Sequence, residues 1–87
     1  MIVGVNRVFP HEGTEYHLQA EDLGSDQGSF EVRVYDGGTV LFQKRISYGG
    51  IIEQKLGKLE FEEAVRAQME KTLQTLQAAI AKGKLGG

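Results

Sequence analysis

The chain of 87 residues carries a formal net charge of −2 and no cysteine, and 40% of its residues are hydrophobic. This length predicts one domain, residues 1–87, with a single small core. Without cysteine there is no disulfide framework, thiolate zinc site or cysteine nucleophile, so a reducing cytoplasm is the expected location. The dispersed Lys and Arg residues disfavour nucleic-acid binding, and the hydrophobicity pattern predicts neither a signal peptide nor a membrane span.

Two strands are expected at the start of the chain. Residues 14–22 alternate between apolar and polar side chains, which is typical of a strand with one solvent-exposed face. Residues 2–9 are predicted as a strand before it, and residues 10–13, Pro-His-Glu-Gly, as the connecting turn. The first strand would carry three apolar side chains on one face: Val3, Val5 and Phe9.

A hairpin with a glycine-rich turn is predicted at the centre of the chain. A three-residue loop, Asp36-Gly37-Gly38, would pair Val34 with Val40 and Val32 with Phe42, keeping the apolar side chains on one face. Such a loop is a type I turn followed by a left-handed residue, a position that suits its last glycine. Two-residue turns about the same residues are the alternatives, but they would split the apolar set between the faces.

Two features depart from the apolar pattern of the sheet. Lys44 falls on the apolar face opposite Phe30, where it would lie at the sheet rim with its amine in water, unless a bulge turns it outward. Ile51-Ile52 lies in a linker, residues 49–58. We interpret this pair as a plug for the open end of the core, with an exposed contact for a partner as the alternative.

One long amphipathic helix is predicted over residues 59–82, with Gly83 as its stop. Its apolar side chains recur every three or four residues and form a single stripe: Phe61, Val65, Met69, Leu73, Leu76 and Ile80. With a sheet over residues 2–48, the predicted fold is α+β, an antiparallel meander of three to four strands with one long C-terminal helix packed on one face.

The length of the helix leads us to expect self-association. A helix of 24 residues extends about 36 Å, whereas four strands span only about 19 Å across a sheet. One end of the helix should therefore overhang and could pair with a second copy; the alternative is that the stripe lies on its own sheet. The candidate interface residues are Met69, Leu73, Leu76, Ile80, Ile51 and Ile52. An open sheet edge is a further candidate interface.

The sequence contains no recognisable catalytic, metal-binding or cofactor-binding motif. His11 and His17 lie six residues apart, which is not the i, i+4 helical pair of a zinc protease. His17 shares a strand face with Glu15 and Glu21, so a weak surface metal site is a hypothesis to weigh against an ordinary solvated face. The acidic residues in the first helical turn suit a helix start. We therefore expect a protein that is not an enzyme and has no cofactor.

The outer face of the sheet is predicted to stay uncovered. It would present Gln19, Leu41 and Gln43 with four candidate binding residues: His17, Arg33, Tyr35 and Arg45. An aromatic ring beside arginines on an open sheet is one way in which RNA-binding folds stack bases. Because one ring is not a platform of several and glutamates share the face, a small-molecule- or nucleic-acid-binding domain is the alternative function rather than the first.

The strand within residues 13–21, the hairpin at residues 37–41 and the terminal helix resemble a loose group of small bacterial sheet-plus-helix domains of unknown function. The resemblance covers most of the chain and implies a module beside other domains, with no known activity. The final Gly86-Gly87 is similar to the tail of ubiquitin-like modifiers and sulfur carriers, which present it after a strand rather than a helix. We expect a non-enzymatic interaction or assembly module acting as a homodimer, with another protein as the alternative partner and no membrane association.

Overall fold

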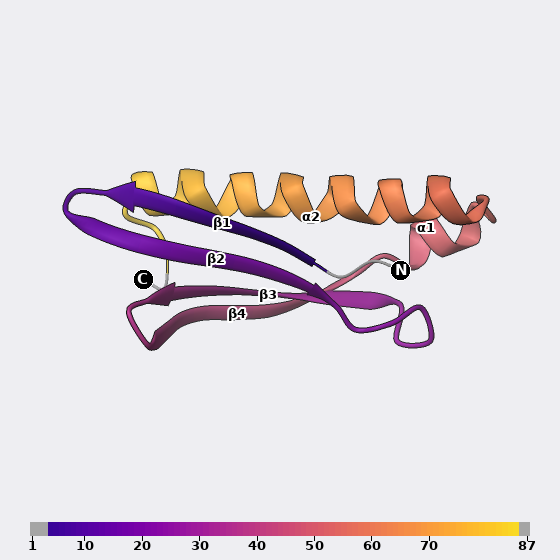
Figure 1. Cartoon of the computed structure of the whole chain (residues 1–87), viewed down its shortest axis with the longest axis horizontal. Coiled ribbons are helices and arrows are strands. Elements are labelled where there is room, and N and C mark those ends of the chain that lie inside the picture. The colour runs from indigo at the N-terminus through magenta and orange to yellow at the C-terminus, as the bar shows by residue number, and fades with distance from the viewer. Residues whose placement is uncertain (1–3, 86–87) are drawn as a thin grey trace.

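Four antiparallel strands form one sheet, and a long helix lies along one of its faces (Figure 1). The computed structural model describes residues 4–85. The strands are hydrogen-bonded in chain order, which confirms the predicted α+β meander. The elements are β1 (Gly4–His11), β2 (Thr14–Asp22), β3 (Ser29–Asp36), β4 (Thr39–Ser47), α1 (Gly49–Glu53) and α2 (Lys58–Ala81). Neither helix of the described region has the length and apolar character that crossing a membrane requires.

The turn between β1 and β2 is shorter than the sequence predicts. Pro10 and His11 belong to β1, and only Glu12 and Gly13 connect the strands, with His11 paired to Thr14. Both connecting residues have positive φ, 49° and 83°, as a type I′ turn requires. The twist of this turn matches that of the flanking strands, so pairing continues to the end of the hairpin.

The central hairpin closes through a two-residue turn at Gly37-Gly38, so the predicted three-residue loop is wrong. The first of these glycines has a φ of 61° and the second does not have a positive φ, which is the pattern of a type II′ turn. β4 then carries a bulge at Leu41. The extra residue shifts the register, so that Val34 lies opposite Phe42 instead of the predicted Val40.

The bulge exchanges the faces of two residues. Val40 lies opposite Tyr35 and therefore points to the outer face, where the sequence predicts Leu41. Leu41 instead lines a shallow hollow with Tyr16 and Ile80 on the helix side. The placement of Leu41 among the outer-face residues is thus wrong, because a bulge interrupts the strict alternation of side chains.

Lys44 remains on the apolar side of the sheet, exposed to solvent. It lies opposite Val32 rather than opposite Phe30, as the predicted register has it. The bulge precedes Lys44 and regular alternation resumes after it, so the lysine is not turned outward. Phe42 and Ile46 flank it on the same face, and both are half-buried against the core.

The core lies between α2 and the inner face of the sheet. Val5 and Phe9 face it from β1, as predicted, while Val3 lies outside the described residues. The buried hydrophobic residues are Val5, Leu18, Ala20, Phe30, Val32, Val34, Tyr48, Val65, Met69, Leu73, Leu76 and Ile80. Within α2, the stripe from Val65 to Ile80 is at most 8% exposed, so the chain's own sheet covers it.

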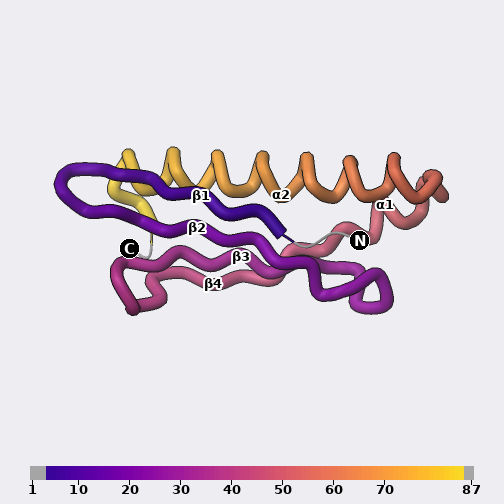
Figure 2. The backbone as a smooth tube through the Cα atoms, viewed as in Figure 1, coloured from indigo at the N-terminus to yellow at the C-terminus, as the bar shows by residue number. Residues whose placement is uncertain are grey.

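The helix runs along the strands rather than across them (Figure 2). The molecule measures 43 × 20 × 17 Å, so a helix of about 36 Å fits only along its long axis. A nine-residue strand extends about 30 Å, and the overhang expected from the sheet width does not arise. The helix stops at Gly83, as predicted: Gly83 has a φ of 69°, and its N–H and that of Lys84 donate to the carbonyls of Ile80 and Ala79.

The predicted linker contains the short helix α1, which closes one end of the core. Tyr48 precedes it and is buried, with ring centroids 6.5 Å from Phe30 and 5.8 Å from Phe61. Ile51 packs against the same core, in agreement with the plug interpretation, whereas Ile52 is 38% exposed. This end of the sheet is therefore sealed mainly by aromatic rings.

Candidate interaction surfaces

Three cross-strand rows of side chains cross the outer face of the sheet, which lies opposite α2. The first row contains Val8, His17, Tyr35 and Val40. The second contains Asn6, Gln19, Arg33 and Gln43, and the third contains Glu21, Glu31 and Arg45. The first row is apolar and aromatic, and the other two are polar or charged.

Tyr35 is the centre of the predicted binding face. His17 lies directly opposite it on β2, and Arg33 lies two residues before it on β3. A hydrogen bond between the Arg33 and Tyr35 side chains is the main cause that raises the pKa of the Arg33 guanidinium, and the carboxylates of Glu31 and Glu21 add to the rise. Arg33 forms an ion pair with Glu31 and lies 4.0 Å from Glu21, so much of its charge is already offset.

Arg45, the fourth predicted residue, also lies on the outer face, at its edge. It is opposite Glu31, which accepts a hydrogen bond from the Gln43 amide at 3.0 Å. Within residues 4–85 Arg45 forms no ion pair of its own. The structure therefore brings His17, Arg33 and Tyr35 together and leaves Arg45 apart from them at the rim.

The two histidines take part in local pairs. His17 Nε2 lies 3.1 Å from Glu15 Oε1. His11 stacks on Phe9 with ring centroids 5.8 Å apart, and its Nε2 is 3.8 Å from Glu12 Oε2. Within the described residues no group of three or more His, Cys, Asp or Glu side chains is placed to hold a metal ion. His17 therefore contributes to the outer face as a ring with one carboxylate partner.

The predicted helix interface is covered by the chain's own sheet. Four of its residues, Met69, Leu73, Leu76 and Ile80, belong to the buried core. Contact with a partner at these positions would require α2 to leave the sheet. Ile51 is half-buried in the same core, which leaves Ile52 as the exposed member of the set.

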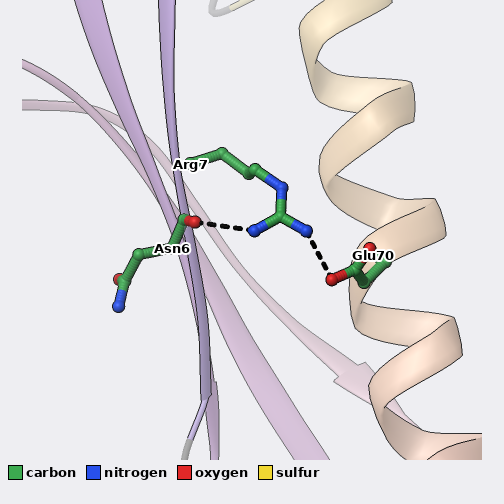
Figure 3. Close-up of polar contacts among 3 residues, drawn as sticks. All are labelled: Asn6, Arg7 and Glu70. Carbon is green, nitrogen blue, oxygen red and sulfur yellow. Dashed lines mark hydrogen bonds and ion pairs between the residues drawn. The ribbon is translucent and has the colours of Figure 1, made fainter.

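Two polar contacts join elements that are distant in the sequence, and the sequence does not predict either of them. Arg7, on the helix side of β1, forms an ion pair with Glu70 of α2 and donates to the Asn6 carbonyl at 2.9 Å (Figure 3). The Tyr48 hydroxyl donates to Asp22 Oδ1 at 2.6 Å. The alternation of side chains in β1 could have indicated the Arg7–Glu70 ion pair, because it places a charged residue on the apolar face.

β4 is an uncovered edge of the sheet. Among the described residues it pairs with β3 alone, and none of its nine side chains is buried. It carries Lys44 on the inner side and Arg45 on the outer side, and it contains no acidic residue. In the part of the chain that the structure describes, Lys44, like Arg45, has no ion-pair partner. The other edge strand, β1, lies beside α2 (Figure 1).

Comparison of the chain with protein-family models, with curated proteins and with solved structures finds no match. The diglycine Gly86-Gly87 lies outside the described residues.

Proposed function

We propose that this chain is a non-enzymatic interaction or assembly module that pairs with a second copy through the outer face of its sheet. The observation that supports this most strongly is the row from Val8 through His17 and Tyr35 to Val40, which crosses all four strands on the uncovered face. Val8 is 53% exposed and Val40 is 46% exposed. A second copy would remove both from water, which is the main driving force for association.

The charges of the outer face suit contact with an identical face. Glu15, Glu21 and Glu31 share the face with Arg33 and Arg45, so neither sign dominates it. In a dimer with two-fold symmetry each copy presents the same patch, and mixed charges allow the arginines of one copy to face the glutamates of the other. A face of one sign would repel itself instead.

The size of the face predicts a weak dimer. Four strands spaced by about 4.8 Å and rows spaced by about 6.8 Å give roughly 400 Å² on each copy. The two copies would together bury about 800 Å², below the roughly 1,200–2,000 Å² of a stable complex. We therefore expect a monomer–dimer equilibrium that depends strongly on concentration. The proposal assigns no catalytic step or cofactor, and the cysteine-free sequence favours the cytoplasm.

A small-molecule- or nucleic-acid-binding domain is the second candidate function. It is favoured by the cluster of His17, Tyr35 and Arg33, which places two aromatic rings and a guanidinium side by side. The carboxylates of Glu31 and Glu21 that pair with Arg33 oppose it, because they would repel phosphates.

Chemical cross-linking tests the outer-face dimer, and the cysteine-free chain allows a single reactive thiol to be introduced. Gln19→Cys places the thiol in the middle row of the outer face, and Gln74→Cys on the exposed side of α2 is the matched control. A short bismaleimide is suitable because packed sheets stand about 10 Å apart, beyond the reach of a disulfide. Gln19→Cys should give cross-linked dimers whose yield rises with concentration, and the control should not. Equal yields would refute the proposal.

A further inference from the structure

The free edge of β4 has the properties of a docking site for an extended peptide. Within residues 4–85 its outward N–H and C=O groups have no strand partner, because β4 is the last strand of the sheet. The stretch from Phe42 to Ile46, between the bulge at Leu41 and the Ser47 carbonyl that accepts from the Gln68 amide at 3.3 Å, is a template on which another strand can add.

The position of the helix leaves this edge open. α2 packs chiefly against β1 and β2, and β4 is the strand farthest from it in the view of Figure 2. Phe42 and Ile46 therefore touch the core from one side and remain half-buried. An added strand would cover both side chains, since cross-strand neighbours on one face lie about 5 Å apart.

The charge of the edge indicates the kind of partner. Lys44 and Arg45 stand on its two faces without ion-pair partners within residues 4–85, although the chain as a whole is acidic. An added strand with acidic residues opposite them would form two cross-strand charge pairs. A basic segment would meet like charge on both faces.

The same charges disfavour a second copy as the occupant. The antiparallel register that sets Phe42 opposite Ile46 of a second copy also sets Lys44 opposite its own counterpart. Like charges directly opposite one another destabilise a strand pair. The edge strand β1 offers no acidic alternative, because its one charged side chain apart from His11 is Arg7.

We infer that the β4 edge binds an extended acidic segment of another protein as an additional antiparallel strand. The backbone groups of β4 supply the binding energy, and the side chains supply the selectivity. The segment carries apolar residues opposite Phe42 and Ile46 and carboxylates opposite Lys44 and Arg45. This site shares Arg45 with the outer face, but pairing through the backbone of β4 does not depend on the proposed pairing of two copies.

A designed peptide tests the inference. The sequence Thr-Val-Glu-Glu-Thr-Val-Thr, with capped ends, sets its valines opposite Ile46 and Phe42 and its two glutamates opposite Arg45 and Lys44 in an antiparallel register. Titration into ¹⁵N-labelled protein at low salt should shift the amide signals of β4 and slow their hydrogen exchange. The same peptide with N-methyl groups on alternate residues cannot pair through its backbone and should cause no shifts.

Charge reversal makes the test specific. The double variant Lys44→Glu/Arg45→Glu should bind the acidic peptide at least about tenfold more weakly, because two attractive pairs become repulsive. It should also gain binding to the peptide with lysines in place of the glutamates. Val8→Glu, on the outer face at the opposite edge, should leave peptide binding unchanged even if it disrupts the dimer.

Three results would overturn the inference. The first is an absence of β4 shifts at millimolar acidic peptide, and the second is equal binding of the acidic and lysine peptides. The third is a concentration-dependent slowing of hydrogen exchange along β4 without peptide in the Val8→Glu variant, whose outer-face pairing is disrupted, which would show that a second copy occupies the edge. None of these results bears on cross-linking through the outer face, so the two proposals can fail separately.

Discussion

The buried hydroxyl of Tyr48 allows one contact of this fold to be tested in isolation. Tyr48 is 1% exposed, and its hydroxyl donates to Asp22 Oδ1 at 2.6 Å, which fastens the junction of β4 and α1 to the end of β2. Tyr48→Phe removes the hydroxyl and keeps the ring that packs against Phe30 and Phe61. The variant therefore reports on a single hydrogen bond to a carboxylate.

We expect Tyr48→Phe to lower the free energy of unfolding by about 1.5 kcal/mol at neutral pH. Hydrogen bonds to charged groups contribute about 1.5–3 kcal/mol. The lower end applies because Asp22 is half-buried and keeps a second donor, the Gly24 N–H at 3.2 Å. For a domain of this size the loss corresponds to a fall in Tm of roughly 6–12 °C.

The same contact has a pH signature. Burial raises the pKa of Tyr48 well above its usual range, and the hydrogen bond to Asp22 adds to the rise. Above about pH 10 an unfolded chain loses this proton while the folded chain keeps it, so stability falls by up to about 1.4 kcal/mol per pH unit. The stabilisation is thus fully present below about pH 10. Tyr48→Phe lacks this slope, and the two proteins should become equally stable near about pH 11.

Urea denaturation followed by far-UV circular dichroism, at about pH 7, 10 and 11, measures both effects. Tyr16→Phe is the matched control, since the Tyr16 hydroxyl has no hydrogen-bond partner within residues 4–85; it should cost less than about 0.5 kcal/mol. A Tyr48→Phe protein as stable as the wild type at neutral pH would contradict a stabilising role for this hydrogen bond. A difference in the free energy of unfolding that stays constant up to about pH 11 would contradict the raised pKa of Tyr48.

Three further substitutions test other parts of the fold. Glu12 has a φ of 49°, so Glu12→Asn should raise the free energy of unfolding by about 0.5–1 kcal/mol; no gain in urea denaturation would contradict the type I′ turn. A Cβ at Gly4 would lie 2.6 Å from the Ala20 carbonyl oxygen, so Gly4→Ala should cost more than about 1 kcal/mol and speed hydrogen exchange in β1. Unchanged hydrogen exchange in β1 would contradict this close approach of Gly4 to the Ala20 carbonyl. Arg7→Ala should cost less than about 1 kcal/mol, and less at high salt, because Arg7 and Glu70 are 44% and 39% exposed; a larger loss would mean that the pair is shielded from water.

The sequence predicts the buried face of each strand correctly at most positions, but it does not predict the register of the central hairpin. Relative to a regular hairpin with a two-residue turn, the predicted three-residue loop and the observed turn with a bulge each insert one extra residue before Phe42 of β4. Either arrangement leaves Phe42, Lys44 and Ile46 on the inner face, so apolar alternation cannot distinguish them. They differ at Val40 and Leu41, and these two residues were assigned to the wrong faces.

The position of the helix could not be derived from its own sequence. The apolar stripe gives the buried side of α2 and its length, but not its direction relative to the strands. The width of the sheet predicts an overhang of the helix, whereas the length of the strands, along which the helix runs, does not. His17, Arg33 and Tyr35 lie on the predicted face because their strands are regular. Arg45 does so as well, because the alternation of side chains resumes after the bulge. The ion pairs that offset Arg33 depend on rotamers that alternation does not specify.

The mass of the protein in solution tests the outer-face interface most directly. Light scattering after size-exclusion chromatography, from about 10 μM to about 1 mM, should show the wild type shifting from monomer toward dimer. Val8→Glu/Val40→Glu should remain a folded monomer, whereas Ala67→Glu/Gln74→Glu, with the same added charge on the exposed side of α2, should behave as the wild type. Leu76→Asp should unfold, because it buries a charge. A wild type that stays monomeric, or a Leu76→Asp protein that is a folded monomer beside a dimeric wild type, would contradict this interface.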